Sequence, residues 1–284
     1  MHSSLGHTTH RPWPLPDEEW TWKQSWLHLA FIHYPIDANA VQARIPTNLR
    51  VQEFDGTAWV GIVPFLMCDV RRGNLPSFST LGAFPEVNLR TYVECNGRPG
   101  VWFFSLDADS WPVVLGGRVL YGAPYFKASM SHTLEGAGFR IESVRARDGT
   151  CFRATCLPVG PAFRSRPGSF EHWMAERYCL YSRVRGATIC TDVHHRPWPL
   201  QAADIQVHQS DLMAAEGLMA GEGAPRCHFS SGVEVVSYAP YRTDKFLEQA
   251  LLPITGQAGH ASLHAAQRPA PVAWANDEPR ARTA

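Results

Sequence analysis

The sequence predicts an α+β domain built on one large antiparallel sheet. Turn pairs that join neighbouring strands recur along the middle of the chain, and short helical segments stand between the resulting hairpins. A large antiparallel sheet twists, and with many strands it curls or closes on itself. We therefore expect a curled sheet with helices at its periphery, formed by a single domain over residues 17–250.

The first helix is predicted at residues 37–46. Asp37 suits the N-cap position, because its carboxylate accepts hydrogen bonds from the free N–H groups of the first turn. Pro46 marks the end of the segment.

A hairpin follows in the segment YVECNGRPGVWFF. Asn96 and Gly97 supply the two residues with positive φ that a type I′ turn requires, which sets Cys95 opposite Arg98. Counting outward from this turn pairs Arg90 with Phe103, Asn88 with Ser105, and Glu86 with Asp107. Side chains alternate between the faces of a strand, so this register places one polar group on a single face. The group consists of Glu86, Asn88, Arg90, Ser105 and Asp107.

The remaining elements follow the same signals. A second hairpin turns at Asp148 and Gly149, a third pair of strands lies in 176–195, and a late strand in 233–242. Further helices are predicted at 111–122, with Pro112 in the first turn, at 168–178, and at 210–221, capped by Ser210.

The two ends of the chain lack periodicity. Residues 1–16 are rich in histidine and proline, and residues 256–284 in alanine, proline, glycine and arginine. We expect a flexible N-terminal segment and a disordered C-terminal tail.

Composition excludes several classes of function. The net charge is zero and the arginines are spread along the chain, so no nucleic-acid partner is expected. No apolar run approaches the roughly 20 residues that span a membrane, and the polar, proline-rich N-terminus lacks the apolar segment of a signal peptide. The seven cysteines form no CxxC pair. We interpret them as reduced thiols of a cytoplasmic protein, with disulfides not expected.

No metal or cofactor is expected. Cys190, Asp192 and His194 share a strand face, but no second cluster supplies a fourth ligand. The chain also lacks the GxSxG, P-loop and GxGxxG patterns.

Long blocks of the sequence resemble a known family. These blocks are FIHYPIDANAVQARIPTNLRVQEFDGTAWVGIVPFLM, FPEVNLRTYVECNGRPGVWFFSLDA, GAPYFKASM, ERYCLYS and HHRPWPLQAADI. Together they resemble the uncharacterised YqjF-like family of the acetoacetate-decarboxylase-like superfamily, over residues 11–245. The resemblance implies an antiparallel β-barrel or cone with surrounding helices and an interior pocket.

The resemblance also identifies departures from the decarboxylases. In those enzymes two lysines follow the proline that corresponds to Pro124, and the first forms a Schiff base. Here Tyr125 and Phe126 occupy these positions, and a family glutamate corresponds to Gly61. True acetoacetate decarboxylation is therefore not expected.

Lys127 is one of only three lysines and lies in the apolar run PYFKASM. In a strand it would share a face with Tyr125 and Ser129, which the resemblance makes the pocket face. Two interpretations stand: a desolvated amine that attacks carbonyls, or a lysine at the edge of the sheet whose stem is buried and whose head reaches water.

The polar group on the first hairpin has three interpretations: a pocket lining, a buried structural network around Arg90, or a solvent-exposed face. If Glu86 and Asp107 are close and buried, their like charges raise one pKa, as in a general acid. Arg177 either binds a substrate carboxylate or caps the preceding helix. Tyr121 and Tyr125 either donate hydrogen bonds to a ligand or belong to the core.

Two functional hypotheses involve a small ligand, and a third is a structural or dimerisation scaffold. The first is a lyase, hydratase, cyclase or aldol-type enzyme acting on a small carbonyl or carboxylate metabolite. Lys127, Glu86, Asp107 and Tyr125 would be catalytic, and Arg90, Asn88, Ser105, Tyr121 and Arg177 would bind substrate. The second is a binding module that holds a small ligand without turnover. A homo-oligomer is compatible with either.

Overall fold

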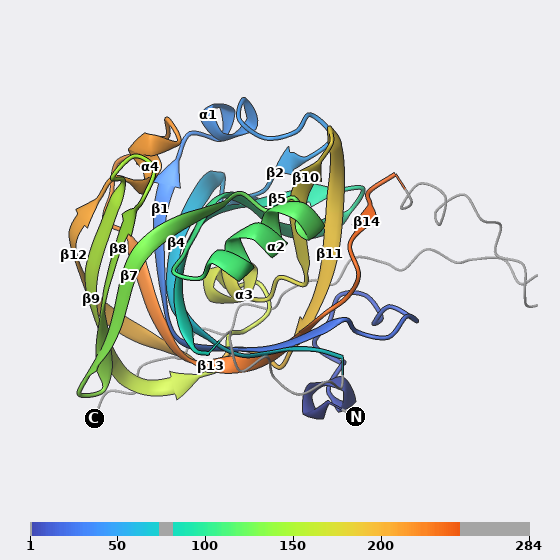
Figure 1. The fold of residues 1–284 in the computed structure, drawn as a ribbon, viewed down its shortest axis with the longest axis horizontal. Helices are drawn as coiled ribbons and strands as arrows, with labels where there is room; N and C mark the ends of the chain where they lie inside the picture. The colour runs from blue at the N-terminus through green and yellow to red at the C-terminus, as the bar shows by residue number, and fades with distance from the viewer. Residues whose placement is uncertain (1, 74–81, 245–284) are drawn as a thin grey trace, which may run out of the picture. The chain divides into compact units, whose positions relative to one another are not determined.

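The computed structural model describes residues 2–73 and 82–244, and its strands join into one sheet that curls around an interior (Figure 1). The predicted C-terminal tail lies outside the described residues. In chain order the strands are β1 (Trp22–Ile36), β2 (Arg50–Val51), β3 (Glu53–Phe54), β4 (Thr57–Arg72), β5 (Phe84–Cys95), β6 (Arg98–Ala108), β7 (Tyr125–Glu135), β8 (Gly138–Arg145), β9 (Cys151–Phe163), β10 (Cys179–Val184), β11 (Ala187–His195), β12 (Leu200–Ser210), β13 (Arg226–Ser237) and β14 (Tyr241–Arg242).

The strand order explains the curl. The sheet runs β14-β11-β10-β6-β7-β8-β9-β12-β13-β1-β4-β5-β2, and additional pairings join β11 to β13 and β5 to β6. These two pairings connect strands that lie far apart in the order, so the sheet returns on itself. The predicted α+β class with a large curled sheet is confirmed. The sheet is mixed rather than purely antiparallel, because the helix between β6 and β7 returns the chain to the same end and makes that pair parallel.

The helices are short and lie outside the strand ladders. Asp37 caps the helix α1 (Ala38–Gln42) by accepting a hydrogen bond from the backbone N–H of Asn39 at 3.0 Å, as predicted. The last one is shorter than predicted, because Ser210 belongs to β12 and does not cap it. Among the described residues the helices are η1 (Ser3–Gly6), α1 (Ala38–Gln42), α2 (Trp111–Tyr121), α3 (Phe170–Ala175) and α4 (Leu212–Ala215). Within this part of the chain, none has the length and apolar character needed to cross a bilayer.

The hairpin of β5 and β6 departs from the predicted register. The pairs Cys95–Arg98 and Arg90–Phe103 form as predicted, but a β-bulge follows, and Leu89 then pairs with Ser105. Phe104 is the extra residue of the bulge. From this point the pairing is shifted by one residue, which moves the following side chains of β6 to the opposite face.

The shift corrects the predicted polar group. Asp107 pairs with Val87, and Glu86 pairs with Ala108. Because neighbours on a strand alternate in direction, Ser105 and Asp107 lie on the face opposite to Glu86, Asn88 and Arg90. The prediction that all five share one face was therefore wrong.

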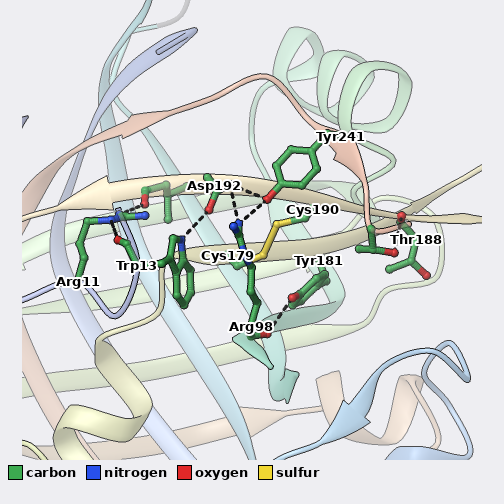
Figure 2. The surroundings of a disulfide bond; sticks show 11 residues. Arg11, Trp13, Arg98, Cys179, Tyr181, Thr188, Cys190, Asp192 and Tyr241 are labelled. Atoms are coloured by element: carbon green, nitrogen blue, oxygen red, sulfur yellow. Dashed lines mark hydrogen bonds and ion pairs between the residues drawn. A yellow bond between two sulfur atoms is a disulfide. The ribbon is translucent and has the colours of Figure 1, made fainter. Parts of the chain in front are cut away.

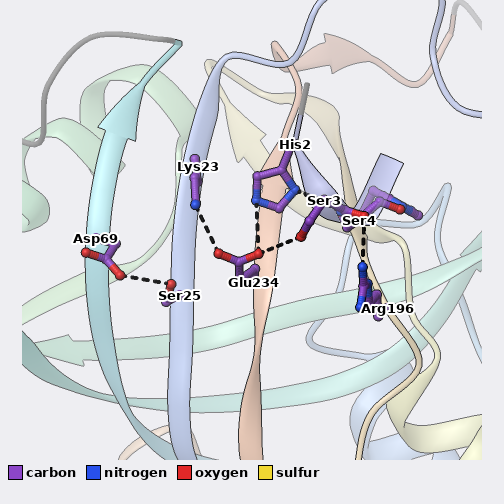
Figure 3. Close-up of polar contacts among 9 residues, drawn as sticks. His2, Ser3, Ser4, Lys23, Ser25, Asp69, Arg196 and Glu234 are labelled. Carbon is purple, nitrogen blue, oxygen red and sulfur yellow. Dashed lines mark hydrogen bonds and ion pairs between the residues drawn. The ribbon is translucent and has the colours of Figure 1, made fainter. Parts of the chain in front are cut away.

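The N-terminal segment packs against the sheet (Figure 3). Glu234 on β13 accepts hydrogen bonds from Ser3 at 2.8 Å and from Lys23 at 3.0 Å. His2 and Ser4 are buried beside them, and Arg11 donates to the carbonyl of Val193 at 2.7 Å. Histidine and arginine therefore act here as anchors to strands β11 and β13, a role that local composition does not reveal.

The cysteines are not all reduced thiols, which corrects the expectation from spacing. Cys179 and Cys190 form a disulfide between β10 and β11, with their Cα atoms 6.2 Å apart (Figure 2). Nearby, Asp192 accepts hydrogen bonds from Tyr241 at 2.7 Å and from Trp13 at 3.3 Å. The residues considered as metal ligands thus have other partners, and no cluster suited to a metal ion occurs among the described residues.

The glycine pair of α2 generates a first prediction. A Cβ on Gly117 would lie 2.4 Å from a ring carbon of Tyr125, whereas a Cβ on Gly116 meets nothing within 4 Å. We expect Gly117→Ala to lower the free energy of unfolding by about 1–3 kcal/mol through overpacking. Gly116→Ala should raise it by about 0.5–1 kcal/mol, because alanine is the better helix former. Urea unfolding measures both changes, and equal effects would contradict this packing of α2 on β7.

Candidate functional site

A cavity of about 250 Å³ lies inside the curled sheet and is bounded on one side by α2. Most of its wall is apolar, so charged groups that reach it are poorly solvated. The apolar wall includes Leu29, Val63, Phe65, Met67, Phe84 and Leu106.

One face of β5 supplies polar groups to this wall. Glu86, Asn88 and Arg90 all line the cavity, and each is at most 9% exposed. The pocket interpretation therefore describes this half of the predicted group. The oxygen Oδ1 of Asn88 is buried without a hydrogen-bond partner among the described residues, so it is available to a ligand.

Asp107, from the other half of the predicted group, belongs to a separate buried network. Arg145 donates to Asp107 at 2.6 Å, and Ser143 donates to the same carboxylate at 3.1 Å. Burial raises the pKa of Asp107, and the neighbouring Arg145 opposes the rise. Neither Asp107 nor Ser105 lines the cavity. Asp107 therefore fits the structural interpretation, centred on Arg145 instead of Arg90, whereas the buried hydroxyl of Ser105 has no hydrogen-bond partner among the described residues.

Glu86 and Tyr125 meet across the cavity wall. The Tyr125 hydroxyl donates to Glu86 Oε2 at 3.0 Å. Burial raises the pKa of Glu86 from 4.5 to about 8; the hydrogen bond from Tyr125 opposes this rise, and the charge of Asp107 adds to it. Burial is thus the main cause, in place of the predicted like-charge pair. At neutral pH Glu86 is mostly a neutral carboxylic acid, which can donate a proton.

Arg90 is a buried cation without a carboxylate partner among the described residues. Its Nη2 makes only long contacts, 3.4 Å to the hydroxyl of Tyr92 and 3.5 Å to the carbonyl of Met174, and its Nε is buried without a partner. The predicted pair with Glu86 does not form, since the two residues lie four positions apart on β5 and Glu86 bonds Tyr125. A buried guanidinium with free donors is suited to a ligand carboxylate.

Arg177 lines the same cavity and contacts the preceding helix, as the capping interpretation predicts. Its Nε donates to the carbonyl of Trp173 in the last turn of α3 at 2.5 Å, and its Nη1 donates to Gln52 Oε1 at 2.5 Å. Burial lowers the pKa of Arg177 from 12.5 to about 10, and the charge of Arg90 adds to the decrease. Arg177 therefore stays cationic at neutral pH.

Lys127 does not line the cavity, although Tyr121 and Tyr125 do. Its ammonium forms an ion pair with Asp109 and donates to the carbonyl of Ala128 at 2.9 Å. The side chain is 21% exposed. This geometry matches the interpretation of a lysine at the edge of the sheet.

Sequence reasoning missed a buried pair next to Arg90. His33 Nε2 lies 2.5 Å from the hydroxyl of Tyr92, and burial lowers the pKa of His33 well below 6.5. Both His33 and Arg90 pair with Gly61 on β4, and a Cβ at that glycine would lie 3.0 Å from His33. Tyr92 continues the period-two pattern of the β5 stripe, a signal that was available in the sequence.

Comparisons with known proteins agree with this fold. The model of the DUF2071 family, described as "Uncharacterized conserved protein (COG2071)", matches residues 23–234. The "Uncharacterized protein YqjF" of Bacillus subtilis (strain 168) is 35% identical over 223 residues, which cover 78% of this chain and 92% of YqjF.

Two solved structures show the same fold at low sequence identity. Acetoacetate decarboxylase from Legionella pneumophila is 15% identical with a TM-score of 0.56, covering 84% of this chain and 94% of that one. The enduracididine biosynthesis enzyme MppR, complexed with pyruvate, is 13% identical with a TM-score of 0.57, covering 83% and 93%. The chain therefore belongs to the DUF2071 family of uncharacterised conserved proteins, and its fold is that of the acetoacetate-decarboxylase-like proteins.

Proposed function

We propose that this protein binds a small metabolite carrying a carboxylate and a carbonyl group, and transforms it by acid–base chemistry of the lyase, hydratase or cyclase type. One observation carries the proposal: a neutral carboxylic acid, Glu86, and an unpaired guanidinium, Arg90, lie on one strand face in one apolar cavity. MppR, which shares the fold, forms a complex with pyruvate.

The spacing along β5 suggests the orientation of the ligand. Glu86, Asn88 and Arg90 follow one another on the same face, so the α-carbons of the first and last are roughly 13 Å apart. A ligand whose carboxylate meets Arg90 extends past Asn88 toward Glu86, where its carbonyl oxygen can accept a hydrogen bond from the neutral carboxyl group. The apolar wall excludes water, which strengthens each of these interactions.

Glu86 and Tyr125 are the acid–base pair in this proposal. Glu86 donates a proton to the ligand oxygen in its neutral form, and its ionised form accepts one from the carbon next to the carbonyl. Tyr125 supplies a hydrogen bond that holds the carboxyl group in place. Lys127 has no part, because its ammonium is engaged with Asp109 outside the cavity lining. Binding without turnover remains the alternative.

Binding and turnover of keto acids test this proposal. We expect calorimetry to detect binding of pyruvate, 2-oxobutanoate or 4-oxopentanoate, and Arg90→Met to weaken it at least about tenfold, because a charged hydrogen bond is lost. Glu86→Gln should keep most of the affinity but abolish exchange of the ligand's α-protons with D2O, followed by NMR. Equal binding by Arg90→Met would overturn the assignment, and binding without exchange in the natural protein would favour a non-catalytic binding module.

Borohydride reduction tests the exclusion of Lys127. We expect no mass increase on the protein after incubation with pyruvate and borohydride, because no amine lines the described cavity wall. A pyruvate adduct mapped to Lys127 would contradict this expectation.

The raised pKa of Glu86 predicts how stability depends on pH. Between its ordinary pKa of 4.5 and its folded pKa of about 8, Glu86 is protonated in the folded chain and ionised in the unfolded one. Unfolding then releases a proton, so this contribution is complete below 4.5 and is lost as pH rises to 8. Compared with Glu86→Gln, the natural protein should lose about 1 kcal/mol of unfolding free energy per pH unit in this window.

Urea unfolding at pH 5, 6, 7 and 8 measures this difference. Glu135→Gln is the matched control, since Glu135 pairs with Arg140 at an exposed turn. Parallel pH curves for Glu86→Gln and the natural protein would show that Glu86 is ionised in the folded state.

A further inference from the structure

Gln52 lies between a surface carboxylate and the cavity cation Arg177. Its Oε1 accepts from Arg177 at 2.5 Å, and its Nε2 donates to Glu94 Oε2 at 3.1 Å. Its backbone N–H donates to the carbonyl of Tyr92 at 2.9 Å, which fixes the residue beside β5. Because a guanidinium only donates and a carboxylate only accepts, these partners leave the amide a single orientation.

The other contacts of Arg177 are also neutral. The guanidinium lies over the rings of Trp173, at 4.8 Å, and Tyr92, at 5.1 Å, and it donates to the carbonyl of Trp173. Among the described residues no carboxylate forms an ion pair with it, and its two side-chain hydrogen bonds go to the carbonyl of Trp173 and to Gln52. Arg177 is thus held in place while its charge stays uncompensated.

A second cation shares this end of the cavity. The Arg90 guanidinium lies 5.7 Å from the ring centre of Tyr92, so both arginines border the same ring. Neither forms an ion pair among the described residues, the Nε of Arg90 has no hydrogen-bond partner there, and Glu86 is bonded to Tyr125 farther along the strand. Two unpaired cations in a poorly solvated site favour a ligand with two negative charges.

From this geometry we infer that Gln52 is a positioning residue that keeps Arg177 available, and that the cavity therefore prefers dicarboxylates to monocarboxylates of equal length. Glutamate at this position would make the same hydrogen bond to Arg177 but neutralise it. The amide of Gln52 holds the guanidinium in place without neutralising it, so its positive charge can pair with a ligand carboxylate. This inference rests on the proposed function, because it specifies the class of carboxylate that the same cavity binds.

An exchange of the two side chains tests the inference at constant net charge. Gln52→Glu combined with Glu94→Gln moves the carboxylate from the surface to Arg177 and retains an amide–carboxylate hydrogen bond between the two positions. Glu94→Gln alone is the control, because it removes the surface charge, which pairs with Arg50, and leaves the cavity unchanged. The probes are 2-oxoglutarate and 2-oxopentanoate, which share a five-carbon chain and differ in one carboxylate.

In calorimetry we expect the natural protein and Glu94→Gln to bind 2-oxoglutarate at least about tenfold more tightly than 2-oxopentanoate, the value of one charged hydrogen bond. The exchanged variant should bind the two probes within about threefold of each other. A merely structural role would weaken both probes together and preserve their ratio. An unchanged ratio in the exchanged variant, with its urea midpoint preserved, would overturn the inference.

The two proposals fail in different ways. If the natural protein binds neither probe and none of the other keto acids, the proposed function is wrong. If it binds both probes equally and Arg90→Met weakens both, the proposed function stands and the role of Gln52 is refuted.

Discussion

Exclusion of water from the inner face of the curled sheet determines whether each ionisable group there is charged or neutral. The same burial acts in opposite ways on acids and on arginines. Glu86 loses its charge, because its ordinary pKa lies close enough to neutrality for burial to raise it to about 8. Arg177 keeps its charge, because burial lowers its pKa only to about 10. An interior that holds both kinds of group is therefore net positive and contains a proton donor.

The bulge at Phe104 decides which acid remains in that interior. In a regular hairpin Asp107 would face Glu86 from the same side of the sheet and would be a natural partner for the cavity arginines. The extra residue turns Asp107 to the other face, where it meets Arg145 at 2.6 Å. Each arginine thus has a different environment: Arg145 has a carboxylate partner, and Arg90 does not. One irregular residue separates a structural ion pair from a candidate binding site.

Local signals predicted much of the fold and half of the site. The Asn96–Gly97 turn, the Asp37 cap and the helix at α2 depend on a few neighbouring residues, so the sequence reports them well. The bulge depends on how the whole sheet curls, and no residue type near Phe104 in the sequence indicates its position. The packed N-terminal segment and the contact of Cys179 with Cys190 depend on strands distant in sequence. For the same reason the sequence did not distinguish Tyr125, which meets Glu86 at the cavity, from Lys127, which does not line it.

The chain places neutral groups where acids would neutralise its cavity arginines. Gly61 pairs with Arg90 across β4 and β5, and the resemblance to the decarboxylases aligns this position with a glutamate. Here the space above the glycine holds the neutral ring of His33, which contacts Tyr92. Beside Arg177 the neutral group is the amide of Gln52, which accepts a hydrogen bond from the guanidinium. Leaving buried cations unpaired is unfavourable in the ligand-free protein, by several kcal/mol per ion, unless an anion offsets the cost. In the proposed function the anionic ligand is the missing partner that offsets this cost for both arginines.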